Sequence, residues 1–185
     1  MSEPIPYNKP DYLFPPRPTR KIQPSKLSKY EGNRYILQPK LDGSCAVIFT
    51  NGTETVVKSR HRRSFTRFKM DMREIQNIHR GDPGTWMVVV GEYMNKSRRD
   101  ERGCVWNQKL VVFDILVYES KLLLGMTTVD RQLLLEDIFP ERPFKPYLSK
   151  ISKNIWRVKN IYDETGFYEK FNEIYFNSNS SIFLH

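Results

Sequence analysis

The tetrapeptide Lys40-Leu41-Asp42-Gly43 holds the residues of this sequence best suited to covalent chemistry. A lysine amine is a nucleophile only when it is neutral, so such a site must lower its pKa by burial or by nearby positive charge. Asp42 is placed to orient the amine, and Gly43 would let the backbone approach a bound ligand closely. An ordinary Asp-Gly turn beside an exposed lysine has the same sequence, so both interpretations stay open at this point.

Two acids follow in apolar segments. Glu92, which comes after Gly91, closes one apolar run, and Asp114, which comes after Phe113, lies inside another. A buried strand has little reason to carry an acid unless that acid has a partner. Each segment alone fits an edge strand, but their order after Lys40 forms a pattern.

Positive charge is concentrated in one stretch of the chain, which has 30 Lys and Arg against 21 Asp and Glu and a net charge of +9. Between Lys58 and Arg73 the single acid is Asp71, and the basic residues are Lys58, Arg60, Arg62, Arg63, Arg67, Lys69 and Arg73. Excess cationic charge favours polyanionic partners, and arginine suits phosphate oxygens. Phe65 and Phe68 interleave with these charges, either as a platform for a base or as core residues behind a solvated helix face.

Taken in order, these motifs resemble those of the covalent nucleotidyltransferases, which are the ATP-dependent DNA and RNA ligases and the messenger-RNA capping enzymes. That family carries a K-x-D-G motif, a basic motif, a G-E motif and an F-D motif on an antiparallel α+β, ATP-grasp-like nucleotide-binding domain. The resemblance covers about residues 35–137. It implies that Lys40 attacks the α-phosphate of ATP to form lysyl-AMP, that Mg²⁺ offsets the phosphate charge, and that AMP passes to a 5′-phosphate end of a nucleic acid.

The resemblance also implies roles for individual residues. Arg60 would contact the nucleotide and help to keep the amine neutral, Glu92 would bind the ribose hydroxyls, and Phe113 would stack on adenine. Around the catalytic Lys40, the implied nucleotide site consists of Gln38, Pro39, Asp42, Gly43, Arg60, Glu92 and Phe113. The residues expected to contact nucleic acid are Lys58, Arg62, Arg63, Arg67 and Lys69. The motifs assign no metal ligand.

Two departures from the family pattern affect the functional prediction. Ser44 and Cys45 follow Gly43, whereas DNA ligases and capping enzymes usually carry an arginine two positions beyond this glycine. This favours an RNA ligase, with a GTP-using capping guanylyltransferase as an alternative. The late E-G-x-x-x-K and K-x-K motifs are not found, because the similar segment 164–170 has one extra residue and the apolar spacing of a helix.

The missing late motifs lead to a second alternative. The chain ends about where these motifs are expected, and it leaves no room for an OB-fold domain. We therefore expect a domain that is incomplete at its C-terminal end and needs a complementary fragment or partner chain, or a degenerate relative. A degenerate relative would be a non-catalytic nucleic-acid-binding or assembly module.

The turn residues and the spacing of apolar residues predict the secondary-structure elements that position these side chains. Asn51-Gly52 favours a tight hairpin, and apolar spacing favours a helix over 66–78. Strands are expected at 45–50, 53–59, 85–93, 109–118 and 121–126, helices at 127–138 and from 167, and the start of a strand at 182–185. These elements predict an α+β domain with antiparallel sheets.

The chain is expected to form one domain preceded by an arm. Eight of the twelve prolines lie within the first 39 residues, which predicts an extended proline-rich arm over 1–33, held on the domain of 34–185 by Tyr12, Leu13 and Phe14. No apolar run reaches the ~20 residues of a membrane span, and residues 1–6 lack the charged-then-apolar pattern of a signal peptide. With Cys45 and Cys104 far apart, we expect a reducing compartment, cytoplasmic or nuclear.

Overall fold

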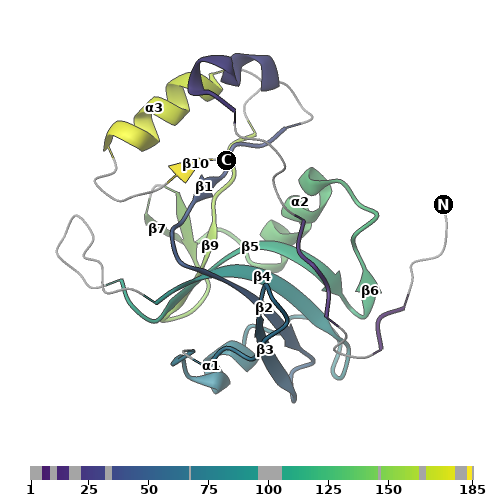
Figure 1. Cartoon of the computed structure of the whole chain (residues 1–185). Coiled ribbons are helices and arrows are strands. Elements are labelled where there is room, and N and C mark those ends of the chain that lie inside the picture. The colour runs from purple at the N-terminus through teal and green to yellow at the C-terminus, as the bar shows by residue number, and fades with distance from the viewer. Residues whose placement is uncertain are drawn as a thin grey trace.

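An eight-stranded, mostly antiparallel sheet forms the centre of the computed structural model (Figure 1). The structure describes residues 6–8, 12–16, 22–31, 35–66, 68–95, 106–145, 147–162, 166–177 and 183–184. The strands of the sheet are β2 (Ser44–Thr50), β3 (Thr55–Ser59), β4 (Met87–Met94), β5 (Lys109–Tyr118), β6 (Lys121–Leu122), β7 (Pro143–Lys145), β8 (Leu148–Lys150) and β9 (Ile155–Val158). Their order is β3-β2-β4-β5-β9-β8-β7, with β6 also on β5. All pairs are antiparallel except β5 with β9, so the expected α+β class is confirmed.

The hairpin of β2 and β3 forms as expected, but with a longer turn. Thr50 pairs with Thr55, so four residues connect the strands instead of two. The side chain of Asn51 accepts hydrogen bonds from two backbone N–H groups of the turn, and Gly52 takes a φ of 86°. An Asn side chain that satisfies the turn backbone stabilises this wider loop.

Strand β5 is irregular at the position where the aromatic residue of the F-D motif lies. Val90 of β4 pairs with Asp114, but Gly91 pairs with Val112, so Phe113 is an extra residue in a β-bulge. Bulges turn a side chain away from the regular alternation and are frequent next to active sites. Gly91 is required here, because a Cβ at this position would lie 2.9 Å from the carbonyl oxygen of Val111.

The helices are η1 (Pro24–Tyr30, a 3-10 helix), α1 (Met72–Gln76), α2 (Thr128–Ile138) and α3 (Phe167–Asn177). The helix expected over 66–78 is wrong in its first half, because α1 begins only after Asp71, whose side chain accepts the N–H of Arg73. Phe65 and Phe68 instead pack against the ring of Tyr93 in the core. Both side chains are half-buried, so the use of these rings as a platform for a base stays a prediction. The strand expected at 121–126 is also too long, because β6 ends at Leu122.

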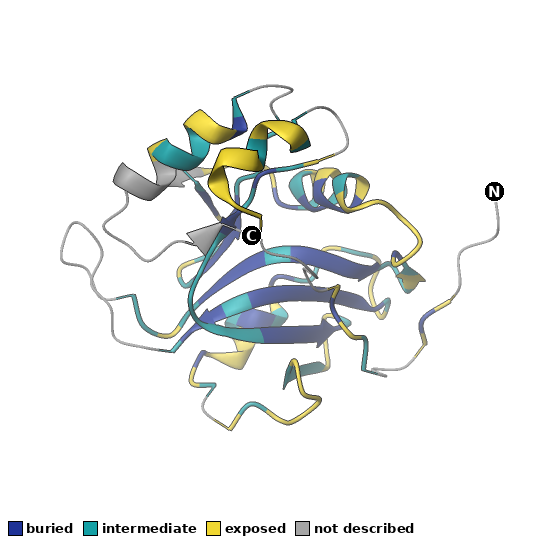
Figure 2. Ribbon diagram, turned by 45° about the horizontal axis from the view of Figure 1, so that its top comes forward, coloured by how far each residue is buried: buried dark blue, intermediate teal, exposed yellow. Residues whose placement is uncertain are grey.

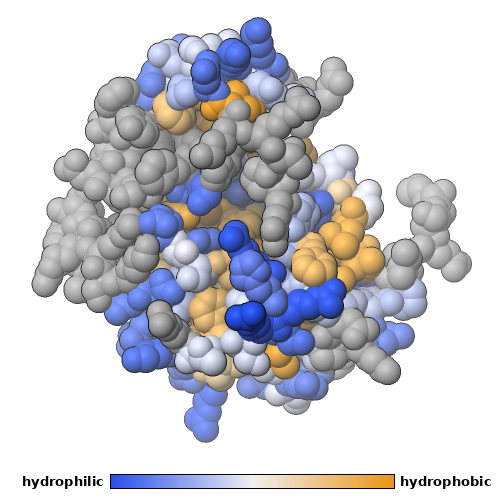
Figure 3. All heavy atoms as spheres, in the orientation of Figure 1, coloured by the Kyte–Doolittle hydropathy of each residue, from blue (hydrophilic) through white to orange (hydrophobic). Residues whose placement is uncertain are grey.

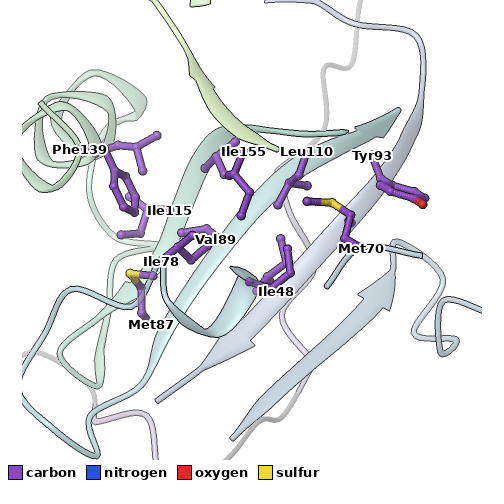
Figure 4. Close-up of a cluster of buried hydrophobic side chains, with 14 of the residues drawn as sticks. Ile48, Met70, Ile78, Met87, Val89, Tyr93, Leu110, Ile115, Phe139 and Ile155 are labelled. Carbon is purple, nitrogen blue, oxygen red and sulfur yellow. The ribbon is translucent and has the colours of Figure 1, made fainter. Parts of the chain in front are cut away.

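Apolar side chains cover both faces of the sheet, and the strands are largely buried (Figure 2). On one face, Ile48, Val89 and Ile115 pack beneath α1 and α2 (Figure 4). On the opposite face, Val47, Phe49, Val88 and Val90 form a second cluster with residues of the N-terminal arm. Helices α1 and α2 thus occupy one face, and the arm covers part of the other.

The N-terminal arm packs on the sheet through a few anchors. Tyr7 is buried and donates its N–H to the carbonyl of Ser120, and Tyr12 and Leu13 pack against the second cluster. The expectation of an extended arm is wrong for 24–30, because these residues form η1. This helix begins with Pro24, and the first position of a helix tolerates proline. Glu31 then accepts the N–H groups of Gly166 and Phe167 at the start of α3. Figure 1 shows η1 and α3 side by side.

Candidate active site

Lys40 lies on a short strand beside the main sheet. It belongs to β1 (Pro39–Lys40), which pairs with β10 (Phe183–Leu184) so that Lys40 is opposite Phe183. Lys40 is half-buried. Just before this strand, the side-chain amide of Gln38 donates to Asn160 Oδ1 at 2.8 Å and to the carbonyl of Phe113 at 3.2 Å. The segment that carries the lysine is therefore tied to the bulge that carries the aromatic residue.

Gly43 joins the K-x-D-G segment to Glu92. Its backbone N–H donates to Glu92 Oε1 at 2.9 Å. A Cβ at this position would lie 2.5 Å from the carbonyl oxygen of Tyr93, so only glycine allows β2 to begin this close to β4. Two motifs about 50 residues apart thus meet through one hydrogen bond.

Glu92 lies among charged groups. Burial raises the pKa of its carboxyl, and the Gly43 N–H and the charges of Lys40 and Arg60 lower it by less, while Asp42 adds a further increase. The pKa of Glu92 therefore stays above its ordinary value. Among the described residues, no donor reaches its second oxygen, Oε2, so this atom is available to a ligand.

A row of cross-strand partners extends from Glu92 across the sheet. Cys45, Glu92, Val111 and Trp156 are successive cross-strand partners on β2, β4, β5 and β9. Phe113 packs beside Val111 and Trp156, against the same cluster as Leu41 and Trp106. Val111 and Trp156 are buried, and Phe113 is half-buried. A carboxylate near a partly open aromatic ring suits a nucleoside, whose sugar is polar and whose base is flat.

The acid of the F-D motif has a structural partner. Asp114 is 7% exposed and forms a bidentate ion pair with Arg131 of α2, with N–O distances of 2.9 and 3.0 Å. The sequence argument that a buried acid needs a partner is confirmed for this residue. The partner itself was missed, because an arginine on an expected helix is most simply read as solvent-exposed.

The predicted basic residues separate into several places. Arg60 is close enough to Glu92 to lower its pKa, and it also lines an exposed pocket together with Arg62 and Arg63. The amine of Lys58 lies over the ring of Phe49, 5.9 Å from its centroid. Lys69 is exposed, and its backbone N–H donates to the hydroxyl of Tyr93. Arg67 lies outside the described residues.

A polar network behind Gln38 was not found from the sequence. Gln132 of α2 donates to the carbonyl of Phe113 at 2.8 Å, and Asn160 donates to Gln132 Oε1 and to Glu136. Burial and the nearby Glu136 raise the pKa of Tyr162 to about 12. These side chains come from segments distant in sequence and carry no motif, so no local pattern indicates them.

The described residues hold no group of three or more His, Cys, Asp or Glu that could bind a metal ion. Asp42 lies two residues beyond Lys40, and the charges of both residues act on Glu92. Mg²⁺ is usually bound through one or two carboxylates together with substrate phosphates, and it keeps several waters. The carboxylates of Asp42 and Glu92 therefore fit an ion that arrives with a nucleotide, and they do not form a cage for a free ion.

No protein-family model matches the sequence, and no curated protein matches it. No helix among the described residues is long and apolar enough to cross a membrane. A comparison with solved structures matches 58% of this chain to the ligase domain of LigD from M. tuberculosis, at 20% sequence identity and a TM-score of 0.43. The match spans 37% of that chain. The protein is thus similar to this ligase domain over part of its length.

Proposed function

We propose that this chain is the adenylation domain of an ATP-dependent polynucleotide ligase that acts on RNA ends. The observation that carries the proposal is the hydrogen bond from the Gly43 N–H to Glu92, which places both motifs at one site. The charges of Lys40 and Arg60 both lower the pKa of the Glu92 carboxyl. A nucleophile, a carboxylate, a cation and an aromatic ring are the groups that nucleotidyl transfer to an amine from a bound nucleotide would use.

In the proposed reaction, the neutral Nζ of Lys40 forms a bond to the α-phosphorus of ATP. The bond from that phosphorus to its bridging oxygen breaks, pyrophosphate leaves, and the nitrogen loses a proton. Glu92 holds the ribose hydroxyls through its free oxygen, Phe113 supports the base, and Arg60 faces the phosphates. Mg²⁺ bound to the phosphates would neutralise part of their charge.

The preference for RNA comes from the residues after Gly43. The position two beyond this glycine is Cys45, directly opposite Glu92 on the sheet. An arginine there would place a cation beside Glu92, as expected for a DNA ligase or a capping enzyme. Ser44 instead accepts a hydrogen bond from Asn95 at 2.8 Å.

Intact-protein mass spectrometry after incubation with ATP or GTP and Mg²⁺ tests the proposal. We expect an AMP-sized gain in the wild type and in Lys153→Ala, which removes an exposed lysine between β8 and β9, and no gain in Lys40→Ala. A GMP-sized gain would indicate a capping guanylyltransferase. No gain with either nucleotide would contradict adenylation by this chain on its own. Repeating the measurement with a complementary C-terminal fragment would then separate an incomplete enzyme from a binding module.

A further inference from the structure

The loop after β3 and the N-terminal arm form a pocket that shares Arg60 with the proposed nucleotide site. It is open, has a volume of about 510 Å³, and is lined by Phe14, Arg60, His61, Arg62 and Arg63. The four loop residues are exposed, and Phe14 is 52% exposed. Strongly hydrophilic and apolar side chains also lie next to each other on the face shown in Figure 3.

The loop is held in one conformation by its own backbone. The N–H of Ser59 donates to the carbonyl of Arg63, and the N–H of Arg62 donates to the carbonyl of Ser59. Arg62 takes a φ of 64°, in the left-handed region that non-glycine residues seldom adopt. Such backbone geometry is frequent at functional sites. The turn presents three guanidinium groups on one short segment.

The arm supplies an aromatic surface to this turn. The guanidinium of Arg62 lies over the ring of Phe14, 4.6 Å from its centroid, and over Tyr12 at 5.6 Å. Tyr12 contacts Phe14 edge to face and packs against Phe49 of β2, which anchors the arm on the sheet. Phe14 keeps half of its surface open although Arg62 lies over it. The aromatic residue and the cations are thus assembled before any ligand binds.

The pocket is cationic within the described part of the chain, and of its charges that of Arg60 also lowers the pKa of Glu92. None of the ion pairs there involves Arg60, Arg62 or Arg63. The described residues that line the pocket include no acid. Arginine forks bind phosphate oxygens, and an exposed aromatic ring stacks on an unpaired base. In a regular duplex the bases are already stacked and leave no face for such a ring.

We propose that this pocket binds an unpaired nucleotide of a nucleic-acid strand, with its phosphates on Arg62 and Arg63 and its base on Phe14. Arg60 lines the pocket and also acts on Glu92, so a strand held here would lead towards Lys40. This last step, the delivery of a strand end to Lys40, rests on the proposed ligase function. Strand binding itself does not depend on it.

Fluorescence anisotropy with labelled single-stranded RNA, single-stranded DNA and a blunt duplex tests this site. The assay contains no ATP, so it reports strand binding whether or not Lys40 becomes adenylated. We expect Phe14→Ala and Phe14→Leu to weaken single-strand binding by about tenfold or more, and Phe14→Trp to retain it. Leucine keeps the apolar packing of the arm and removes only the flat ring, so it separates stacking from folding.

The cationic part of the site has its own measurement. For single strands, each neutralised phosphate contributes about 0.7 to the slope of log K against log salt. We expect Arg62→Ala with Arg63→Ala to lower this slope by about 1 to 1.5. The matched double variant Lys26→Ala with Lys29→Ala removes two exposed charges from η1 and should leave it unchanged. Wild-type binding by Phe14→Leu, or an unchanged slope in the arginine variant, would overturn the proposal.

Discussion

Glu92 and Asp114 lie on neighbouring strands of one sheet and differ in what holds them. Glu92 on β4 accepts one backbone N–H, and burial keeps its pKa raised. Asp114 on β5 has both oxygens on the guanidinium of Arg131, and its Oδ1 also accepts the N–H of Ile115. The first carboxylate has an oxygen to offer a ligand, and the second is committed to the fold.

This difference shows that the same sequence signal can have two origins. An acid inside an apolar run indicates a partner, but the partner is either another part of the chain or a molecule that binds to it. Arg131 is 4% exposed and belongs to the chain, so Asp114 is structural. Lys40 and Arg60 act on Glu92 without enclosing it. Mutation of Asp114 should therefore lower the stability of the fold, whereas mutation of Glu92 should not.

The largest expected effect on stability is that of Asp114→Ala. It leaves the buried guanidinium of Arg131 without its carboxylate. Removing one partner of a buried ion pair typically lowers the free energy of unfolding by about 3–5 kcal/mol. Urea unfolding followed by circular dichroism measures this loss. In the double variant Asp114→Leu with Arg131→Met, apolar side chains replace both charges, so most of the stability should return. A loss in Asp114→Ala below about 1 kcal/mol would contradict a structural role for the pair.

A smaller effect is expected for Gly43→Ala, which acts on the Glu92 side of the comparison. The added Cβ would lie 2.5 Å from the carbonyl oxygen of Tyr93, so β2 and β4 must separate locally. Overpacking of this kind costs about 1–3 kcal/mol, and the displaced N–H would weaken its bond to Glu92. We expect reduced thermal stability and loss of the AMP-sized mass gain.

The control for this substitution is Gly125→Ala, because no atom lies within 4 Å of a Cβ built at Gly125. Its stability should remain within about 0.5 kcal/mol of the wild type. Adenylation of Gly43→Ala at the wild-type rate would show that the close approach at Gly43 is not needed by the site.

Local patterns in the sequence predicted most elements of the fold. Strand β5 was expected at its observed bounds, and α2 begins after the predicted cap at Thr127. Strands β7, β8 and β9 were missed, because prolines 140, 143 and 146 indicate chain breaks and β9 pairs in parallel with the distant β5. The length of α1 was wrong because tertiary packing of Phe65 and Phe68 on Tyr93 prevails over helical spacing.

The candidate site was predictable to the extent that its residues stand in motifs. Lys40, Gly43 and Glu92 were selected from spacing and residue type, and the structure brings them together. The hydrogen bonds of Gln132 and Asn160 were not predictable, because they depend on where α2 and the end of β9 lie in space. The contact of Phe14 with Arg62 joins segments almost 50 residues apart and likewise needs the three-dimensional structure.

The smallest effect on stability, and the one that most sharpens the comparison, is expected for Glu92→Gln. The amide oxygen of glutamine can still accept the Gly43 N–H, and the substitution removes a charge that burial makes unfavourable. We therefore expect this variant to be at least as stable as the wild type at pH 8, while it loses adenylation.

The pH dependence of stability tests the cause of this effect. Because the pKa of Glu92 is raised in the folded protein, the folded state binds its proton more readily than the unfolded state does. The wild type should therefore lose stability as the pH rises from the ordinary carboxyl pKa through the raised one, and Glu92→Gln should lack this contribution. The urea midpoints of both proteins, measured between about pH 4 and pH 8, give this difference. This range begins just below the pKa of ~4.3 of a free glutamate. A variant clearly less stable than the wild type at pH 8 would place Glu92 with Asp114, as a residue that the fold requires.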